Sequence, residues 1–374
     1  MVTPHLPPHQ AANALLPHLL GHGLAERGHR ARYLTFAPAD GSARAGGSDA
    51  AEVAYVRRRS QAFRATRVPQ ALEATETWWK AAPLVRQSDL LHIHSNTWMN
   101  QVAARLAVRH RRPYLLTHYG TEIWHHDGKD PRFRRLNREA RHVTFYSRAL
   151  LARARELDLP LKAASVVYPP VADAFVPASP ETRAALRRRH LPEGGTLLLN
   201  VKRLHPLADQ ATLLRALARV RRTRPDVRLL IAGTGETEAG LRRLAAELHL
   251  DEGAAVRFLG LVPNDAVAEL QAAADLFVLP SVLEATPTVA LEALACGTPV
   301  VSADNPGGLE LGELFGEDVA LVPKGDAGAL AAAIEGFLAA PRRARPATAE
   351  RIARHFRLGS VVESYLRLYR EVAA

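Results

Sequence analysis

Short apolar runs alternate along the chain with longer segments whose apolar residues recur every three or four positions. The apolar runs have the length and composition of buried strands, and they lie at residues 31–37, 89–95, 113–120, 142–147, 164–170, 195–201, 227–235, 255–262, 275–281, 297–304 and 319–323. The segments with helical periodicity include 11–27, 96–110, 208–223, 236–248 and 264–274. Strands that alternate with helices predict an α/β fold of parallel sheets with helices on both faces, and the pattern occurs twice here.

The length of the chain and one irregular segment predict two domains. With 374 residues, the chain is too long for one typical hydrophobic core. Residues 169–195 are rich in proline and glycine and predict a hinge. We therefore expect a first domain at residues 1–177 and a second at 190–354. Residues 355–374 have an amphipathic helical pattern, and we expect them to pack back on the first domain.

Composition and cysteine usage are those of an ordinary globular protein. Hydrophobic residues make up 47% and charged residues 23% of the chain. A single cysteine excludes an intramolecular disulfide and favours a reducing compartment. We find no uninterrupted apolar stretch of about 20 residues and no signal-peptide pattern at the start. The expectation is a cytoplasmic protein, or one peripheral to the inner face of the membrane.

All of the excess positive charge lies in the first half. Residues 1–177 carry 25 Lys and Arg against 14 Asp and Glu, whereas residues 178–374 carry 24 against 24. A general preference for arginine would raise both halves. The asymmetry predicts that the first half meets an anionic partner: a phosphorylated acceptor, an acidic glycan or a membrane surface. Nucleic acid is not expected, because zinc-ligand spacing, an aromatic-glycine RNA motif and a contiguous basic arm are all missing from the sequence.

Two glutamates eight positions apart flank a segment that otherwise has a buried pattern, "SVLEATPTVALEALACGTPVVS". Glu284 falls in the loop after the strand at 275–281, and Glu292 falls on the second turn of a helix expected at 288–295. Loops at the carboxyl ends of parallel strands are where doubly wound folds bind ligands. The pair therefore marks a candidate ligand site.

Several motifs occur together in a fixed order with this glutamate pair. They are "GLAERGHRARYLTF", "VKRL", "IAGTG", "VRFLGLV", "ADLFVLPS" and "GTPVV". In this order the chain resembles, over nearly its whole length, the retaining glycosyltransferases of family 4, also called glycosyl transferases group 1. The resemblance implies the GT-B fold, in which two Rossmann-like doubly wound domains face each other across a cleft and C-terminal helices cross back to the first domain.

The resemblance also implies an enzymatic reaction. A sugar moves from a nucleotide-diphospho-sugar, with a UDP-sugar favoured, to a hydroxyl acceptor, and the configuration at the anomeric carbon is retained. No metal and no cofactor beyond the sugar nucleotide are expected. The second domain would hold the donor and the basic first domain the acceptor. The acceptor, the base, the sugar and the oligomeric state are not fixed by the sequence.

Charged residues of the second domain fit a donor diphosphate and its sugars. Arg203 follows a strand, and its guanidinium can bind phosphate oxygens bidentately. Lys202 is a second candidate, although neighbouring residues at a strand end point to opposite faces. By the resemblance, Glu284 contacts the transferred sugar and Glu292 the ribose, whose two hydroxyls match a carboxylate.

Backbone groups complete the expected donor site. The amides of Ala285, Thr286 and Thr288, with Pro287 between them lacking one, precede a helix and form an anion cradle. Gly233 lacks a side chain and so allows the backbone to approach the nucleotide closely. By the resemblance, backbone groups near Leu261 and Val262 hold the base.

In the first domain, "PYLLTHYGTEIW" resembles the family pattern T-x-H-G-x-D. Tyr119 occupies the position of the family's histidine, and His118 precedes it by one residue. Either His118 has moved in by a small backbone change, or Tyr119 has taken the place, or His118 is a hydrogen-bonded strand-end residue without a role. Glu122 replaces the aspartate as an acceptor contact. The catalytic candidates are therefore Glu284, His118 and Arg203.

Three departures from the family pattern bear on activity. The family's phosphate lysine would fall at Ala208 or Asp209, its Gly-Gly loop falls at Ala11 and Ala12, and its Gly-Phe-Gly is "ATP" here. Loss of one phosphate cation would cost roughly 2–4 kcal/mol of transition-state stabilisation. Lys202 or a histidine such as His9 could compensate. Without compensation, the alternative is a weak or inactive nucleotide-sugar-binding protein. A hydrolase or an epimerase on the same architecture is a further alternative.

Overall fold

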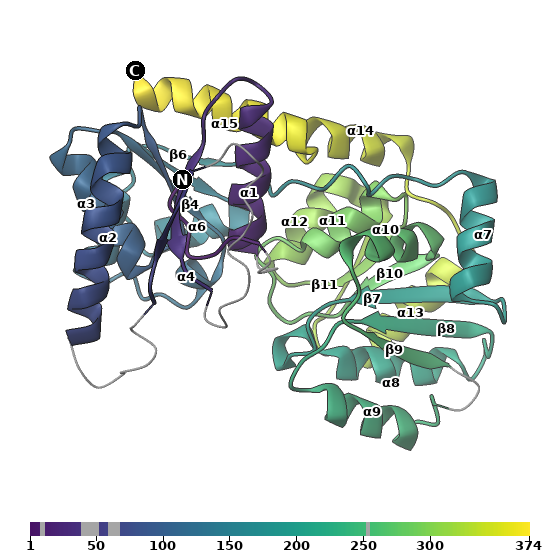
Figure 1. The fold of residues 1–374 in the computed structure, drawn as a ribbon. Helices are drawn as coiled ribbons and strands as arrows, with labels where there is room; N and C mark the ends of the chain where they lie inside the picture. The colour runs from purple at the N-terminus through teal and green to yellow at the C-terminus, as the bar shows by residue number, and fades with distance from the viewer. Residues whose placement is uncertain (8–11, 39–51, 59–67, 252–254) are drawn as a thin grey trace. The chain divides into compact units, whose positions relative to one another are not determined.

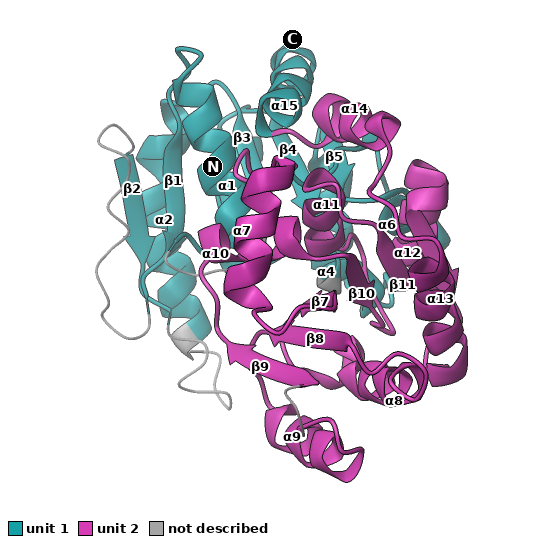
Figure 2. Ribbon diagram, turned by 90° about the vertical axis from the view of Figure 1, so that its right-hand side faces the viewer, with its two compact units in different colours: residues 1–170, 358–374 teal, residues 171–357 magenta. Residues whose placement is uncertain are grey.

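The computed structural model describes residues 1–7, 12–38, 52–58, 68–251 and 255–374. The chain divides into two compact units, which Figure 2 distinguishes by colour. Unit 1 comprises residues 1–170 and 358–374, and unit 2 comprises residues 171–357. Both units are built from parallel strands with helices between them, so the expected α/β class and the expected repetition of the pattern are confirmed (Figure 1).

Unit 1 contains two sets of parallel strands, and the first residues of the chain connect one set to the other. Four strands pair in the order β3 (Leu91–His94), β4 (Tyr114–His118), β5 (His142–Phe145) and β6 (Ala164–Val166), and β1 (Arg32–Phe36) pairs with β2 (Glu52–Val56). Val2 bridges to both Leu34 and Ile93 in parallel orientation. The amides and carbonyls of Met1–Thr3 therefore connect β1 to β3. All carboxyl ends of these strands lie at one edge.

The helices of unit 1 are α1 (Ala12–Ala25), α2 (Val68–Arg86), α3 (Trp98–Arg109), α4 (Thr121–Trp124), α5 (Pro131–Glu139), α6 (Arg148–Glu156) and α15 (Leu358–Ala373). Helix α15 packs against α1 and β4. Its buried residues Val361, Val362 and Tyr365 form a core cluster with Leu20 and Leu115. The amphipathic pattern at the end of the sequence thus provides part of the core of unit 1.

Unit 2 contains a six-stranded parallel sheet. Its order is β12 (Val319–Val322), β11 (Val300–Ala303), β10 (Leu276–Leu279), β7 (Thr196–Val201), β8 (Val227–Ala232) and β9 (Val256–Gly260). The helices are α7 (Pro180–His190), η1 (Pro206–Ala208), α8 (Gln210–Val220), α9 (Glu238–Glu247), α10 (Asn264–Ala273), α11 (Thr288–Ala295), α12 (Pro306–Phe315), η3 (Gly316–Asp318), α13 (Ala327–Ala339) and α14 (Pro346–His355). Helices α8, α9 and α13 share one core cluster with the strands, whereas α10 packs with α7 and α11.

The segment expected to be a hinge contains helix α7. The Ser179 hydroxyl accepts a hydrogen bond from the Thr182 amide, and Pro180 occupies the first helical turn, where its missing amide costs nothing. Arg183 and Arg187 then reach the Asp275 carboxylate at 2.5 and 2.6 Å. Because of these contacts, residues 180–190 belong to unit 2, and the chain passes between the units at 170/171 and 357/358.

No helix in the described part of the chain is both long enough and apolar enough to cross a membrane.

Candidate functional site

The carboxyl edge of the unit 2 sheet brings together residues from three loops. Lys202 and Arg203 follow β7, Gly233 follows β8, and Glu284 lies in the loop after β10. Strands β7, β8 and β10 are neighbours in the sheet and run parallel. Residues separated by up to about eighty positions in sequence therefore share one edge, as the sequence predicts.

Lys202 and Glu284 form the closest charged pair at this edge. The Lys202 Nζ atom lies 2.6 Å from Glu284 Oε1, and the side chain of Glu284 is only 8% exposed. Of the two candidate phosphate cations, Lys202 is thus the one directed at the glutamate expected to contact the sugar. Its charge compensates a carboxylate that is largely removed from water.

Arg203 points into solvent beside a second carboxylate. Its side chain is 72% exposed, and its Nη2 atom lies 3.7 Å from Glu236 Oε2. The other oxygen of Glu236 lies 3.6 Å from Nε2 of His205. His205 Nδ1 accepts a hydrogen bond from the Leu207 amide, so its remaining nitrogen carries the proton and faces Glu236. Two donors therefore converge on one exposed carboxylate.

Sequence reasoning missed Glu236 and His205. Glu236 directly follows "IAGTG" and His205 directly follows "VKRL", so both stand next to motifs that had been singled out. Their proximity depends on the pairing of β7 with β8, which the motifs do not state.

The two residues at the positions expected for the family's lysine have structural roles. Ala208 is buried, and Asp209 has a left-handed backbone (φ 48°) while its carboxylate accepts a hydrogen bond from the Thr212 amide at the start of α8. Neither residue supplies a cation to the sheet edge. Lys202 lies one residue before Arg203 and is the described cation that pairs with Glu284.

The glycines after β8 permit close approach of the loops to one another. Gly233 has φ 141°, and a Cβ atom there would lie 2.0 Å from the Lys202 carbonyl oxygen. At Gly235 a Cβ atom would lie 2.1 Å from the Leu204 carbonyl oxygen. The close approach that glycine permits is therefore to the backbone of the segment carrying Lys202 and Arg203. The resulting packing fixes the backbone from which these two cations extend.

The start of helix α11 offers unpaired amides beside Glu284. Pro287 is the N-cap residue, and no side chain caps the helix. Within the described residues, no backbone carbonyl accepts from the amides of Thr288 and Val289. Ala285 and Thr286 are half-buried in the preceding loop. An anion placed here would meet the N–H groups of Thr288 and Val289 and the positive end of the helix dipole.

Glu292 lies on the second turn of α11, as expected, and is half-buried. Burial raises the pKa of its carboxyl to about 8. No described residue forms a hydrogen bond or ion pair with this carboxyl group. Among the described residues this carboxyl group has no partner, and because of its burial it is mostly protonated and uncharged at pH 7.

Leu261 and Val262 follow β9 on the same sheet. Leu261 is 68% exposed, and Val262 is half-buried. Gly260 before them has φ 69°, so the chain turns in the left-handed region as it leaves the strand. The turn leaves an apolar side chain unpacked at the carboxyl edge.

In unit 1, His118 is completely buried at the end of β4. Its Nε2 atom donates to Asn137 Oδ1 at 2.9 Å, and its ring packs against Phe133 and Phe145. Its Nδ1 atom lies 3.6 Å from Glu122 Oε1. The structure therefore favours the strand-end interpretation of His118 over the catalytic one, because every side of the ring faces the interior of unit 1.

Glu122 is used within its own loop. Its carboxylate accepts hydrogen bonds from the amides of Tyr119 and Gly120 at 2.7 and 3.3 Å. Burial alone would raise the pKa of this carboxyl, but the neighbouring His118 ring and the Tyr119 amide bring the net pKa below its usual value. The carboxylate stabilises the turn that presents Tyr119, and an acceptor contact would compete with these bonds.

Tyr119 contacts a second histidine that sequence reasoning did not single out. Its hydroxyl lies 2.7 Å from Nδ1 of His94, a fully buried residue at the end of β3. The other ring nitrogen of His94 is buried without a hydrogen-bond partner. Next to it, Ser95 has φ 74°, a strained conformation for a residue other than glycine. An imidazole therefore lies beside the family's histidine position, supplied by the neighbouring strand.

His92 connects the sheet of unit 1 to helix α15. Its two ring nitrogens lie 2.7 Å from the hydroxyls of Tyr369 and Thr117. The rings of His92 and His94 are 3.9 Å apart. Burial lowers the pKa of both histidines well below the usual value. Both are therefore neutral near pH 7.

The remaining expectations concern the start of the chain and metals. Ala11 and His9 lie outside the described residues, and Ala12 is the first residue of α1. Among the side chains that the structure describes, no group of three His, Cys, Asp or Glu residues is arranged to hold a metal ion.

Two family models match the two halves of the chain. Residues 182–355 match the model "Glycosyl transferases group 1", and residues 17–171 match "Glycosyl transferase 4-like domain". Together they cover most of unit 2 and of the first part of unit 1. The chain belongs to the glycosyl transferases group 1.

This group 1 glycosyl transferase is similar to curated glycosyltransferases. It is 35% identical over 219 residues to the GDP-mannose-dependent α-(1-6)-phosphatidylinositol monomannoside mannosyltransferase of Mycolicibacterium smegmatis, which covers 56% of each chain. It is 39% identical over 180 residues to D-inositol 3-phosphate glycosyltransferase 2 of Catenulispora acidiphila, covering 46% of this chain and 41% of the relative. These matches span about half the length of the curated relatives.

Solved structures match this group 1 glycosyl transferase over almost its whole length. HepE from Anabaena, solved in complex with UDP, has a TM-score of 0.78 at 20% identity and covers 99% of both chains. Sucrose-phosphate synthase from Thermosynechococcus elongatus has a TM-score of 0.77 at 24% identity, covering 99% of this chain and 95% of that one. The expected GT-B fold is thereby confirmed.

Proposed function

We propose that this protein transfers a hexosyl group from a nucleotide-diphospho-sugar to a hydroxyl acceptor, with retention at the anomeric carbon. Unit 2 binds the donor, and the basic unit 1 binds the acceptor. Membership of a glycosyl transferase family supports the reaction class. The location proposed is the cytoplasm.

The arrangement at the carboxyl edge of the unit 2 sheet carries the proposal. A donor diphosphate needs cations and N–H donors, and here Lys202 and Arg203 lie at the same edge as the free amides that start α11. The sugar and the ribose need hydroxyl acceptors, which Glu284 and Glu292 provide at the loop and at the second turn of the same helix. Few other ligands would use all of these groups at once.

The chemistry assigned to these residues is electrostatic. As the bond between the anomeric carbon and the diphosphate breaks, charge grows on the phosphate oxygen, and nearby cations and amides stabilise it. The acceptor oxygen forms the new bond on the same face of the sugar. Its proton passes to the departing phosphate oxygen, so the reaction is balanced with a nucleoside diphosphate as the second product.

Lys202 takes the role of the missing lysine in this proposal. The positions expected for that lysine are a buried alanine and a helix-capping aspartate. Lys202 instead brings a positive charge to Glu284 at 2.6 Å. The charge available to the donor site is thus retained at a different position in the sequence.

Donor and acceptor are proposed as classes. We favour a UDP-sugar, with GDP-mannose as the competing donor, because one structural neighbour was solved with UDP and one relative is named for GDP-mannose. For the acceptor we propose an anionic polyol such as an inositol phosphate or a phosphatidylinositol-linked sugar. The positive charge of residues 1–177 and the names of the relatives support this class.

A thermal-shift panel of UDP-, GDP- and ADP-sugars tests the donor site. A ligand at a hundred times its Kd adds about 2.7 kcal/mol to the free energy of unfolding, which raises the melting temperature measurably. Arg203→Ala and Glu292→Ala should abolish the shift, whereas Arg243→Ala and Glu335→Ala, which change exposed residues of α9 and α13, should keep it. Equal shifts in all four variants would contradict the site.

Turnover with candidate acceptors tests the reaction, and NMR of the anomeric proton in the product tests retention. The competing function is a nucleotide-sugar-binding protein of low or no activity, which the absence of a cation at Ala208 and Asp209 favours. Binding of a donor without turnover, across inositol phosphate and lipid acceptors, would support that function instead.

A further inference from the structure

The outer surface of unit 1 carries aromatic and aliphatic side chains that are largely exposed to solvent. On helix α2, Trp79 is 75% exposed and Leu72 is 55% exposed. Thr75 and Pro83 are also exposed, and the spacing of three or four residues places all four on one side of the helix. The opposite side of α2 is buried against the rest of unit 1. Tryptophan is enriched at interfaces, including those with membranes, where one end of its side chain is apolar and the other is wet.

Helices α2, α3 and α5 form one layer over the sheet. Strands β3, β4 and β5 are neighbours in that order and run parallel, and α3 and α5 lie in the crossovers between them. Right-handed crossovers place successive helices on the same face. Helix α2 connects β2 to β3, and this step crosses the sheet in the same direction as the steps from β3 to β4 and from β4 to β5. The contacts of α3 with both α2 and α5 agree with this order. The outward sides of the three helices therefore make one continuous surface.

Arginine dominates the α3 and α5 part of this surface. The exposed arginines there are Arg105, Arg109, Arg132, Arg135 and Arg138, beside the exposed Val108 and Pro131. Helix α3 has no acidic residue, and α5 has only Glu139. Within the described residues, no carboxylate lies within ion-pair distance of any of the five arginines. The surface is thus cationic without internal compensation.

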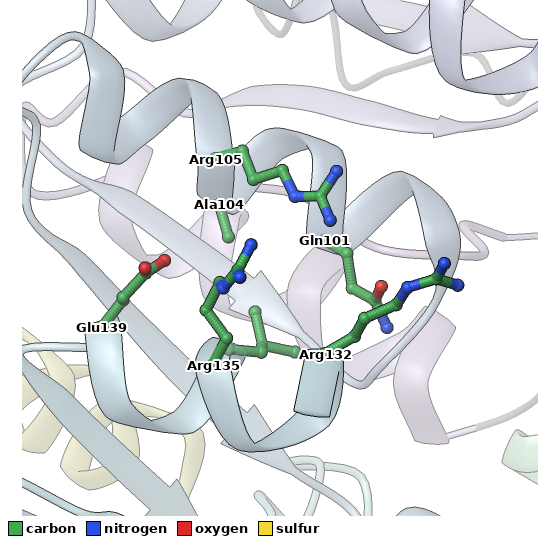
Figure 3. A pocket seen from close by; sticks show the side chains of 7 residues that line it. Gln101, Ala104, Arg105, Arg132, Arg135 and Glu139 are labelled. Atoms are coloured by element: carbon green, nitrogen blue, oxygen red, sulfur yellow. The ribbon is translucent and has the colours of Figure 1, made fainter. Parts of the chain in front are cut away.

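Figure 3 shows Arg105 from α3 and Arg132 and Arg135 from α5 around a shallow hollow, with Glu139 set apart from their guanidinium groups. The hollow holds only about 10 Å³, less than a small-molecule ligand requires. Arg132 also stacks over the ring of Trp98 at 4.5 Å, which fixes it in place. The arginines therefore present charge to something outside the molecule.

We propose that the outward surface of α2, α3 and α5 binds the surface of an anionic lipid bilayer. Arginines would meet lipid phosphates, and Trp79 and Leu72 would enter the interface, where tryptophan is favoured. A peptide partner would need a groove, whereas the hollow between α3 and α5 holds only about 10 Å³. The proposal does not depend on sugar transfer, so it can fail or hold independently of the proposed function.

Co-sedimentation of the full chain with vesicles tests the surface. We expect binding to vesicles of phosphatidylglycerol mixed with phosphatidylcholine, little binding to phosphatidylcholine alone, and loss of binding at high salt. Replacing Arg105, Arg132 and Arg135 together by glutamine should weaken binding by about fivefold per arginine, or roughly a hundredfold in all. A matched variant with Arg188, Arg222 and Arg243 of unit 2 changed to glutamine should bind as the wild type does.

The tryptophan distinguishes a membrane from other polyanions. Trp79→Ser should weaken binding to anionic vesicles by about tenfold and leave binding to heparin unchanged. The control Val176→Ser changes an exposed apolar residue of unit 2 and should have no effect. Trp79 fluorescence should shift to the blue on vesicles, compared with the Trp79→Phe variant. Failure to bind anionic vesicles, or vesicle binding that is insensitive to Trp79, would overturn the proposal.

Discussion

The Lys202 ammonium lies 2.6 Å from the Glu284 carboxylate, at the edge of the unit 2 sheet where β7 and β10 end. The glutamate is nearly buried, and the lysine is partly exposed. The carboxylate therefore depends on the lysine more than the lysine depends on the carboxylate. This asymmetry gives the first testable prediction.

Lys202→Met should destabilise unit 2, because it leaves a buried carboxylate without its counter-ion. We expect a loss of about 1–3 kcal/mol in the free energy of unfolding, below the usual cost for a fully buried pair because Lys202 is partly exposed. Adding Glu284→Gln should recover most of that loss. Urea denaturation of both single variants and the double variant measures the coupling. Lys324→Met, at an exposed position, is the control. Strictly additive effects would show that the pair does not matter for stability.

The stability contributed by Glu292 should fall as pH rises. Its pKa is raised to about 8 in the folded protein, from an ordinary value of 4.5. Between these values the unfolded state has lost the proton and the folded state has kept it, so unfolding becomes easier by up to about 1.4 kcal/mol per pH unit. Glu292→Gln should remove this slope between pH 5 and 8, as measured by urea denaturation. Glu335→Gln, on the exposed side of α13, should retain it.

The same shifted pKa predicts a proton release on donor binding. Ribose hydroxyls that donate to the Glu292 carboxylate favour its charged form and so lower its pKa. Calorimetric titration with a sugar nucleotide at pH 7, in buffers of different ionisation enthalpy, should reveal the release. Glu292→Gln should abolish it.

Acid should destabilise unit 1 through its two stacked histidines. His92 and His94 have pKa values well below 6.5 in the folded protein, chiefly because they are buried. Below pH 6.5 the unfolded state takes up protons that the folded state refuses, so stability is lost as pH falls, by about 1.4 kcal/mol per pH unit for each histidine. His94→Gln should remove about 1 kcal/mol of the stability lost between pH 6.5 and 5.5. His22→Gln, at an exposed position on α1, should leave it intact.

Gly233→Ala should disturb the loop that carries the cations. An added Cβ atom would lie 2.0 Å from the Lys202 carbonyl oxygen, and the backbone there has φ 141°. We expect a loss of at least about 1–3 kcal/mol in the free energy of unfolding. Gly336→Ala provides the contrast, because this residue lies inside α13 with no atom within 4 Å of an added Cβ. That change should stabilise the protein by about 0.5–1 kcal/mol. Equal effects of the two changes would contradict the close approach.

Much of the fold follows from the sequence because parallel strands are apolar on both faces. The runs at 195–201 and 275–281 could be recognised by that pattern, and the helix expected at 288–295 has those bounds in the structure. The position of Glu292 on its second turn followed directly. Strand order did not follow, since equivalent apolar runs can pair in several ways. The contacts of Glu236 with Arg203 and His205 depend on that order.

The points at which the sequence falls short have local physical causes. A hinge is predicted over residues 169–195, including 180–190, because proline signals a loop, whereas proline in the first turn after a capping serine begins a helix, α7. His118 and Tyr119 could not be separated by their motif, because adjacent residues at a strand end point in opposite directions. His118 points toward Asn137 and Tyr119 toward His94, and both partners come from other elements.

Helix α15 completes the core of unit 1, although it follows all of unit 2 in the chain. During synthesis on the ribosome, Leu20 and Leu115 emerge early, and the residues that cover them, such as Tyr365 and Val362, emerge only after residues 171–357. Unit 2 can therefore fold while the nascent unit 1 still exposes an apolar face. This order makes unit 1 the part of the protein that needs protection from aggregation until translation has passed residue 366.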